Sequence, residues 1–294
     1  TVLEAGQRVA DRLEPMVAKQ LKAAFRRVIG PKMVGNPIME RSLAKPRGYP
    51  GDYLIMDMRY DDRVELGDGL RGLFDRYAFD HYQLIKERCE KIKRILTAYL
   101  LDLSPSGKPW RACSMGAGPC REWVDLGQQL SGRAISGPAL PQVALTCLDR
   151  DTEALAYAKT RLEENPLLGS VEYVAADLLK FAQADSWPHY AGQYDLVYSL
   201  GVANYFYDTT LAMIIDTGFR LLRPGGELII THKASETFNF VFADWVCDWT
   251  FVKRSVVDFT RSFQQALAQF RGQYEWRMEW KPDEEMFGIV KRLA

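Results

Sequence analysis

The sequence predicts an α/β fold, in which strands and helices alternate, preceded by a helical N-terminal region. First, a strand-like run leads through Gly116-Ala-Gly118 into a helix-like run. Second, two later strand-like runs, 143–148 and 171–176, are separated by a helical stretch and each is followed directly by an aspartate. Third, the chain closes with two strand-like stretches joined by Lys281-Pro-Asp-Glu, which is typical of an antiparallel hairpin.

The first hundred residues have the apolar spacing of helices. Residues 2–29 carry Leu13, Val17, Leu21, Phe25 and Val28 at helical intervals, and a second helical pattern runs over 66–103. Residues 104–109 are rich in Pro, Ser and Gly and predict a linker. We therefore expect a helical cap over 1–103 that contributes to substrate binding, followed by an α/β domain over 110–294.

The glycine turn predicts a cofactor site. Glycine turns tightly and has no Cβ to hold a ligand away, and the start of the next helix offers unpaired N–H groups. Gly116 and Gly118 follow a run of small residues, and a helix-like pattern begins near Glu122. This arrangement suits a nucleoside cofactor, although a G-x-G that only closes a βα turn would look the same.

The two strand-end acids strengthen this interpretation. In an open α/β sheet, ligands bind beyond the carboxyl ends of the strands. Asp149 follows the strand after the glycine turn, where a carboxylate can accept both hydroxyl hydrogens of a ribose. Asp177 follows the next strand and suits an adenine amino group, which is a hydrogen-bond donor.

The remaining elements complete the pattern. Residues 194–199 predict a fourth strand, 208–222 a helix, and 227–231 a fifth strand after the turn Arg223-Pro-Gly-Gly226. A helical, aromatic insertion is expected at about 236–272. Residues 274–280 and 286–293 then form the closing hairpin.

Residues 110–294 resemble the class I S-adenosylmethionine-dependent methyltransferases. The resemblance implies a Rossmann-like, seven-stranded sheet with a closing antiparallel hairpin, and S-adenosylmethionine as cofactor. Cys120 stands where this class often has a third glycine, and Ser114 where it often has an acid, so Glu122 is expected to meet the methionine ammonium. Arg121 replaces the last glycine of the dinucleotide fingerprint, which disfavours NAD or FAD. The residues expected to contact the cofactor are Ser114, Gly116, Gly118, Glu122, Asp149, Arg150, Asp177, Leu178 and Ser199.

A second motif points to a narrower group. The stretch Arg47-Gly-Tyr-Pro-Gly-Asp-Tyr53, followed by Leu73-Phe-Asp-Arg-Tyr77, resembles a bacterial group that makes the methyl ester of 3-hydroxypalmitic acid, an extracellular signal. That likeness covers nearly the whole chain. The loop is expected to cover the sulfonium end of the cofactor with Tyr49 and Tyr53. A purely structural loop that packs the cap onto the sheet remains an alternative.

Candidate catalytic groups follow the fourth and fifth strands. Asn204 and Tyr205 lie where the class places the group opposite the methyl, and either could instead cap the next helix. The segment 199–205 has no Asp/Asn-Pro-Pro-Tyr motif, which argues against methylation of nucleobase amines. His232 ends the fifth strand and is a candidate base, beside the alternative of a structural histidine. Tyr49 and Tyr53 complete the candidate catalytic set.

Composition excludes several classes of partner. Lys plus Arg equals Asp plus Glu at 38 each, so nucleic acid is not expected as a ligand. No apolar run approaches the roughly 20 residues that span a bilayer. Five widely spaced cysteines form neither a zinc motif nor a disulfide framework, so we expect no metal and a cytoplasmic location.

The sequence therefore predicts methyl transfer to a carboxyl, hydroxyl or amine of a small molecule, in secondary metabolism or signalling. Two alternatives stay open. The cofactor could be used for another alkyl transfer, such as cyclisation to azetidine-2-carboxylate, or the chain could bind it without turnover. The acceptor atom and the oligomeric state are left open by the sequence.

Overall fold

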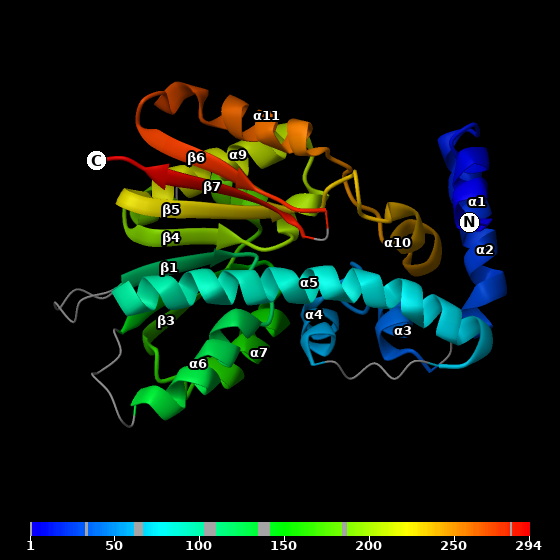
Figure 1. Ribbon diagram of the computed structural model, residues 1–294, viewed down its shortest axis with the longest axis horizontal. Helices are drawn as coiled ribbons and strands as arrows, with labels where there is room; N and C mark the ends of the chain where they lie inside the picture. The colour runs from blue at the N-terminus through cyan, green and yellow to red at the C-terminus, as the bar shows by residue number, and fades with distance from the viewer. Residues whose placement is uncertain are drawn as a thin grey trace.

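A seven-stranded sheet with the order β3-β2-β1-β4-β5-β7-β6 forms the centre of the molecule (Figure 1). The computed structural model describes residues 2–32, 35–61, 67–102, 110–134, 142–183, 187–282 and 284–294, so the predicted linker 104–109 lies outside the described residues. The strands are β1 (Trp110–Met115), β2 (Val143–Asp149), β3 (Leu168–Ala175), β4 (Tyr194–Ser199), β5 (Leu222–His232), β6 (Tyr274–Glu279) and β7 (Met286–Arg292). β1 to β5 are parallel and β7 is antiparallel to both neighbours, which confirms the predicted α/β fold.

The inner strands are apolar runs because helices cover both faces of the sheet. All six residues of β4 are buried, whereas the edge strand β3 has no buried residue along its length. On one face lie α5 (Gly69–Asp102), α6 (Arg121–Ala134) and α7 (Thr152–Leu162), which share a core with Trp123 and Tyr198. On the other face lie α8 (Leu178–Gln183), α9 (Asp208–Leu221) and α11 (Val256–Ala266).

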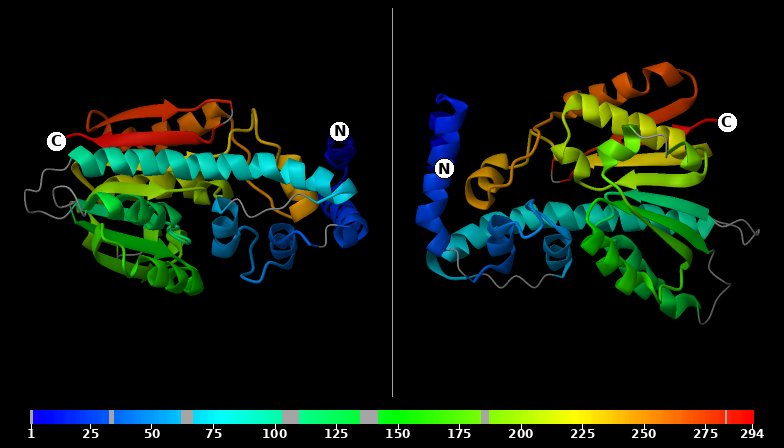
Figure 2. Two further views of the ribbon diagram at one scale, coloured as in Figure 1. Left: turned by 60° about the horizontal axis from the view of Figure 1, so that its bottom comes forward. Right: turned by 180° about the vertical axis from the view of Figure 1, so that it is seen from behind.

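The N-terminal helices lie along the N-terminal half of the long helix α5 (Figures 1 and 2). They are α1 (Val2–Ala10), α2 (Pro15–Ile29), α3 (Pro37–Ala44) and α4 (Tyr53–Tyr60). The predicted insertion after β5 contains two helices with different packing. α10 (Phe240–Cys247) packs against α1, α2 and α3, whereas α11 packs on the sheet beside α9. The motif 73–77 lies within α5, and its side chains at 73, 74 and 77 lie outside the described residues.

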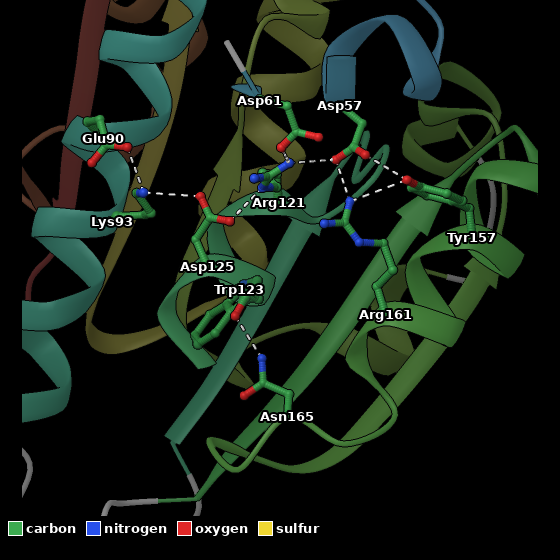
Figure 3. A network of polar contacts seen from close by, with 10 residues as sticks. All are labelled: Asp57, Asp61, Glu90, Lys93, Arg121, Trp123, Asp125, Tyr157, Arg161 and Asn165. Atoms are coloured by element: carbon green, nitrogen blue, oxygen red, sulfur yellow. Dashed lines mark hydrogen bonds and ion pairs between the residues drawn. The ribbon is translucent and has the colours of Figure 1, made fainter. Parts of the chain in front are cut away.

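A network of charged side chains fixes α4 to the α/β part of the molecule (Figure 3). Asp57 of α4 accepts hydrogen bonds from Arg121, Tyr157 and Arg161, which belong to α6 and α7. Arg121 also pairs with Asp61 at 2.6 Å and with Asp125 at 2.5 Å. The residue that replaces the fingerprint glycine therefore anchors the helix that closes the site. None of the helices in the described part of the chain is both long and apolar enough to cross a bilayer.

Candidate functional site

A cavity of about 460 Å³ lies at the carboxyl ends of the parallel strands. Its lining follows the strand order, from Asp177 after β3 and Asp149 at the end of β2 to Gly116 after β1. Beyond β1 it continues to Gly201 after β4 and Lys233 after β5. The opposite wall consists of the loop before α4, the helices α4 and α5, and residues 248–251. One end of the cavity therefore has two acids, and the other end has a lysine.

The two glycines of the glycine turn serve different purposes. Gly116 has φ 76°, and a Cβ there would lie 2.3 Å from the Cγ2 atom of Val202. Gly118 has φ 52°, and a Cβ there would meet no described atom within 4 Å. Because Gly118 lines the cavity, that open space belongs to the site. The backbone after β1 is thus bare where a ligand can approach it.

The carboxylate of Asp149 is held in a fixed orientation. Its Oδ2 accepts a hydrogen bond from the Gly118 N–H at 2.8 Å, and its Oδ1 accepts one from the Asp151 N–H at 2.9 Å. Burial raises the pKa of this carboxyl above its usual range, and the two N–H groups oppose that shift. Each oxygen keeps a second lone pair for a ligand hydroxyl.

Asp177 is placed one strand further along. It precedes α8, and its Oδ1 accepts hydrogen bonds from the N–H groups of Leu179 at 3.0 Å and Lys180 at 3.2 Å. Those bonds leave the second carboxylate oxygen for a donor in the cavity, which Asp177 and Leu178 both line.

Glu122 lies in the first turn of α6 and faces the cavity beside the glycine turn. It is buried, and its Oε1 accepts a hydrogen bond from the Tyr198 hydroxyl at 2.5 Å. That hydroxyl in turn accepts one from the indole N–H of Trp123 at 2.8 Å. Burial raises the pKa of Glu122. Ser114, where the class often has an acid, lines the same part of the cavity.

The loop before α4 spans the cavity between two fixed ends. At one end the Arg47 guanidinium binds both carboxylate oxygens of Asp151, and the Tyr49 hydroxyl donates to Asp151 Oδ2 at 3.1 Å. At the other end Gly51, with φ 77°, packs so closely on Trp249 that a Cβ would lie 2.0 Å from its ring. The Tyr49 hydroxyl is therefore at the β2 end of the cavity.

Tyr53 also lines the cavity, and its ring packs on that of Tyr157 at 5.1 Å between centroids. The Arg150 guanidinium stacks over the ring of Tyr49, with its Cζ atom 4.8 Å from the ring centroid. The fold thus brings Tyr49 and Tyr53 of the loop to the end of β2, which carries Asp149. Arg150 and the other predicted cofactor residues that line the cavity lie around the same space.

Asn204 and Tyr205 line the cavity but use their polar atoms within the protein. The Asn204 amide donates to the Gly201 carbonyl at 2.9 Å and accepts the Lys233 N–H at 2.9 Å. The Tyr205 hydroxyl accepts the Trp249 indole N–H at 2.6 Å, and desolvation of this hydroxyl raises the pKa of Tyr205 to about 12. Asn204 therefore joins the loop after β4 to the end of β5.

Two predicted residues lie outside the cavity lining. His232 is buried: its Nδ1 is 2.8 Å from the Lys233 carbonyl and its Nε2 is 3.0 Å from Arg254, whose guanidinium must be the donor. Burial lowers the pKa of His232 to about 4, so it is neutral at pH 7. The Ser199 hydroxyl donates to the Met115 carbonyl at 2.8 Å. The Ser199 side chain therefore joins the ends of β4 and β1, and the His232 side chain joins the end of β5 to Arg254.

The sequence reasoning missed a buried charged cluster at the β5 end. Arg88 and Lys233 line the cavity, and both pair with Glu285. These cations lower the pKa of Glu285 to about 2 against the effect of its burial, and burial lowers the pKa of Lys233 to about 8. A signal existed in the sequence, because Arg88 interrupts the apolar helical stripe of Ile85 and Ile92. Across the described residues, no group of three or more His, Cys, Asp or Glu is arranged to hold a metal ion.

Comparisons with known proteins agree with this fold. Residues 131–226 match the model of a methyltransferase domain family. The matched segment includes Asp149 and Asp177 but not the glycine turn. A search of curated proteins finds no match.

Three solved structures share the architecture. A possible exported protein from Bordetella parapertussis is 18% identical, with a TM-score of 0.62 over 87% of this chain and 86% of its own. The CMeT domain of the citrinin polyketide synthase is 14% identical, with a TM-score of 0.54 over 99% and 93%. A putative O-methyltransferase from Nostoc punctiforme is 11% identical, with a TM-score of 0.50 over 86% and 69%. At these identities the likeness concerns the fold.

Proposed function

We propose that this chain, a class I S-adenosylmethionine-dependent methyltransferase, methylates a small molecule bound at the β4–β5 end of the cavity. The observation that carries this proposal is the order of the lining. The groups suited to a nucleoside follow β3, β2 and β1, and the cavity continues past β4 to Lys233. Cofactor and acceptor would then lie side by side in one cavity.

The residues present fit the cofactor. We assign the ribose to the carboxylate of Asp149, the adenine to Asp177 and Leu178, and the methionine end to the backbone of 116–118 with Ser114 and Glu122. The open space at Gly118 supports this assignment, because a side chain at that position would fill the cavity. When bound, S-adenosylmethionine supplies a methyl group already activated by its sulfonium.

The protein's own part is then to align the acceptor and to exclude water. Alignment at about 3–3.5 Å supplies much of the rate of such a transfer. Asn204 positions the loop after β4, while Tyr205, Trp249 and Phe251 form an aromatic wall around the acceptor. The acceptor would be a carboxyl, hydroxyl or amine, and an acid of the 3-hydroxypalmitate type stays a hypothesis from the sequence motif. Secondary metabolism or signalling is the proposed setting. The five cysteines are free and buried, which supports the proposed cytoplasmic location.

Calorimetry is expected to show micromolar-range binding of S-adenosylmethionine and S-adenosylhomocysteine and no binding of NAD. Turnover with small molecules retained on the purified protein should release S-adenosylhomocysteine. Release of methylthioadenosine would show a different alkyl transfer, and binding without turnover over a broad panel would show a non-catalytic protein. Binding of NAD alone would contradict the proposal.

The tyrosine loop is tested by removing hydroxyls and keeping rings. Tyr49→Phe should weaken cofactor binding about 2- to 10-fold, the effect of one modest hydrogen bond, because it removes one bond between the loop and Asp151, two residues from the Asp149 carboxylate proposed to bind the ribose. Tyr53→Phe removes the hydroxyl of a residue that lines the cavity and should lower turnover. Melting temperatures should stay close to wild type. If both variants lose stability but retain activity per folded molecule, the loop serves packing alone.

A further inference from the structure

The β5 end of the cavity carries more positive than negative buried charge. Arg59, Arg88 and Lys233 are 7%, 4% and 4% exposed, and Glu285, which is 2% exposed, is the carboxylate that pairs with two of them. Asp248, the acid that lines this end of the cavity, forms ion pairs with Arg26 and Lys45. A buried charge without a counter-ion is costly, so this excess needs a physical reason.

Arg59 is the unusual member of this group. Its guanidinium stacks between the rings of Tyr82, at 4.6 Å, and Trp249, at 4.7 Å. Within the described residues no carboxylate forms an ion pair with it, and its buried Nε lacks a hydrogen-bond partner. Arginine offers five donors in a planar fork that matches a carboxylate. The two stacked rings hold this fork in place without using its donors.

Arg59 lines a small cavity beside the main one. This second cavity has a volume of about 20 Å³ and is lined by Arg59 and Lys233 together with aromatic side chains. Four residues line both cavities: Ile85, Lys233, Trp249 and Phe251. Its volume is close to the roughly 10–15 Å³ that one water needs, so it leaves room for a small polar group and not for a phosphate.

We propose that Arg59 and Lys233 bind a carboxylate of the methyl acceptor in this small cavity, as an anchoring group that is not itself methylated. Lys233 follows β5, two strands from the glycine turn after β1. Neighbouring strands lie about 4.8 Å apart, which separates the two sites by roughly 10 Å. An acceptor atom must come within about 3–3.5 Å of the methyl group, so the acceptor is a different atom of the same molecule. This inference rests on the proposed function.

The test uses simple acids on the full chain saturated with S-adenosylhomocysteine. Benzoate and octanoate are titrated by calorimetry beside benzamide and octanamide, which have similar shapes without the charge. Each acid should bind at least about tenfold more tightly than its amide, as expected for hydrogen bonds to a charged group. Arg59→Met and Lys233→Met should each remove most of this preference, and Arg59→Lys should keep part of it.

Controls separate this inference from the proposed function. Affinity for S-adenosylhomocysteine should stay within about twofold in Arg59→Met and Lys233→Met. Lys93→Met removes a buried cation that pairs with Glu90 and Asp125 outside the cavity, and should change neither ligand's binding. Equal affinity for acid and amide would overturn the inference, as would parallel loss of S-adenosylhomocysteine binding, which would assign the cations to the cofactor's carboxylate. Failure of the wild type to bind S-adenosylhomocysteine at all would instead contradict the proposed function.

Discussion

Glu285→Gln is expected to destabilise the folded protein by about 3–5 kcal/mol, the usual cost of removing one partner from a buried ion pair. The substitution keeps the shape of the side chain but leaves Arg88 and Lys233 buried without their counter-charge. Chemical denaturation of both proteins at pH 7 measures the difference. The neighbouring Glu284→Gln is the matched control, because Glu284 is more exposed and its pairs with Lys91 and Lys281 should contribute less than about 1 kcal/mol.

The ion pairs of Glu285 also make the stability of the folded protein depend on pH. The folded pKa of Glu285 is lowered from 4.5 to about 2. A lowered folded pKa contributes stability that is present above pH 4.5 and is lost as the pH falls towards 2. This lowering of the pKa corresponds to about 3 kcal/mol of folding free energy. The wild type should therefore lose its advantage over Glu285→Gln in this window. An equal stability of the two proteins at pH 7 would contradict the assignment of a charged Glu285.

Asp149→Ala is expected to weaken binding of S-adenosylhomocysteine by roughly 10- to 150-fold, which corresponds to about 1.5–3 kcal/mol. The substitution removes the proposed ribose acceptor and also frees the N–H groups of Gly118 and Asp151. Asp149→Asn separates the two effects, because its single carbonyl oxygen can keep one of those bonds. Calorimetry measures the affinities, and circular dichroism checks that each variant is folded.

Asp177→Ala is the comparison at the next strand. Its carboxylate also caps α8, so a loss of stability is expected together with a smaller loss of affinity than in Asp149→Ala. Unchanged affinity in folded Asp149→Ala would place the ribose elsewhere in the cavity.

The sequence alone determined the sheet and one half of the cavity. Strand-like runs that are buried on both faces, glycines at a turn and acids at strand ends are local patterns, and each one has a direct structural consequence. The parallel order of the strands then forces Gly116, Asp149 and Asp177 to one edge of the sheet. The placement of these residues around one cavity could therefore be predicted without knowing any long-range contact.

The other half of the cavity depends on tertiary contacts that only the structure shows. Arg59, Arg88, Lys233 and Glu285 lie on four separate segments, and nothing local in the sequence indicates that they meet. His232 seemed available as a base at the end of β5, yet Arg254, 22 residues further on, occupies its ring nitrogen. Charges far apart in the sequence become neighbours through the packing of α4, α5 and the β5–α10 connection. The same packing buries them, and burial is what makes an unpaired charge expensive enough to indicate a ligand.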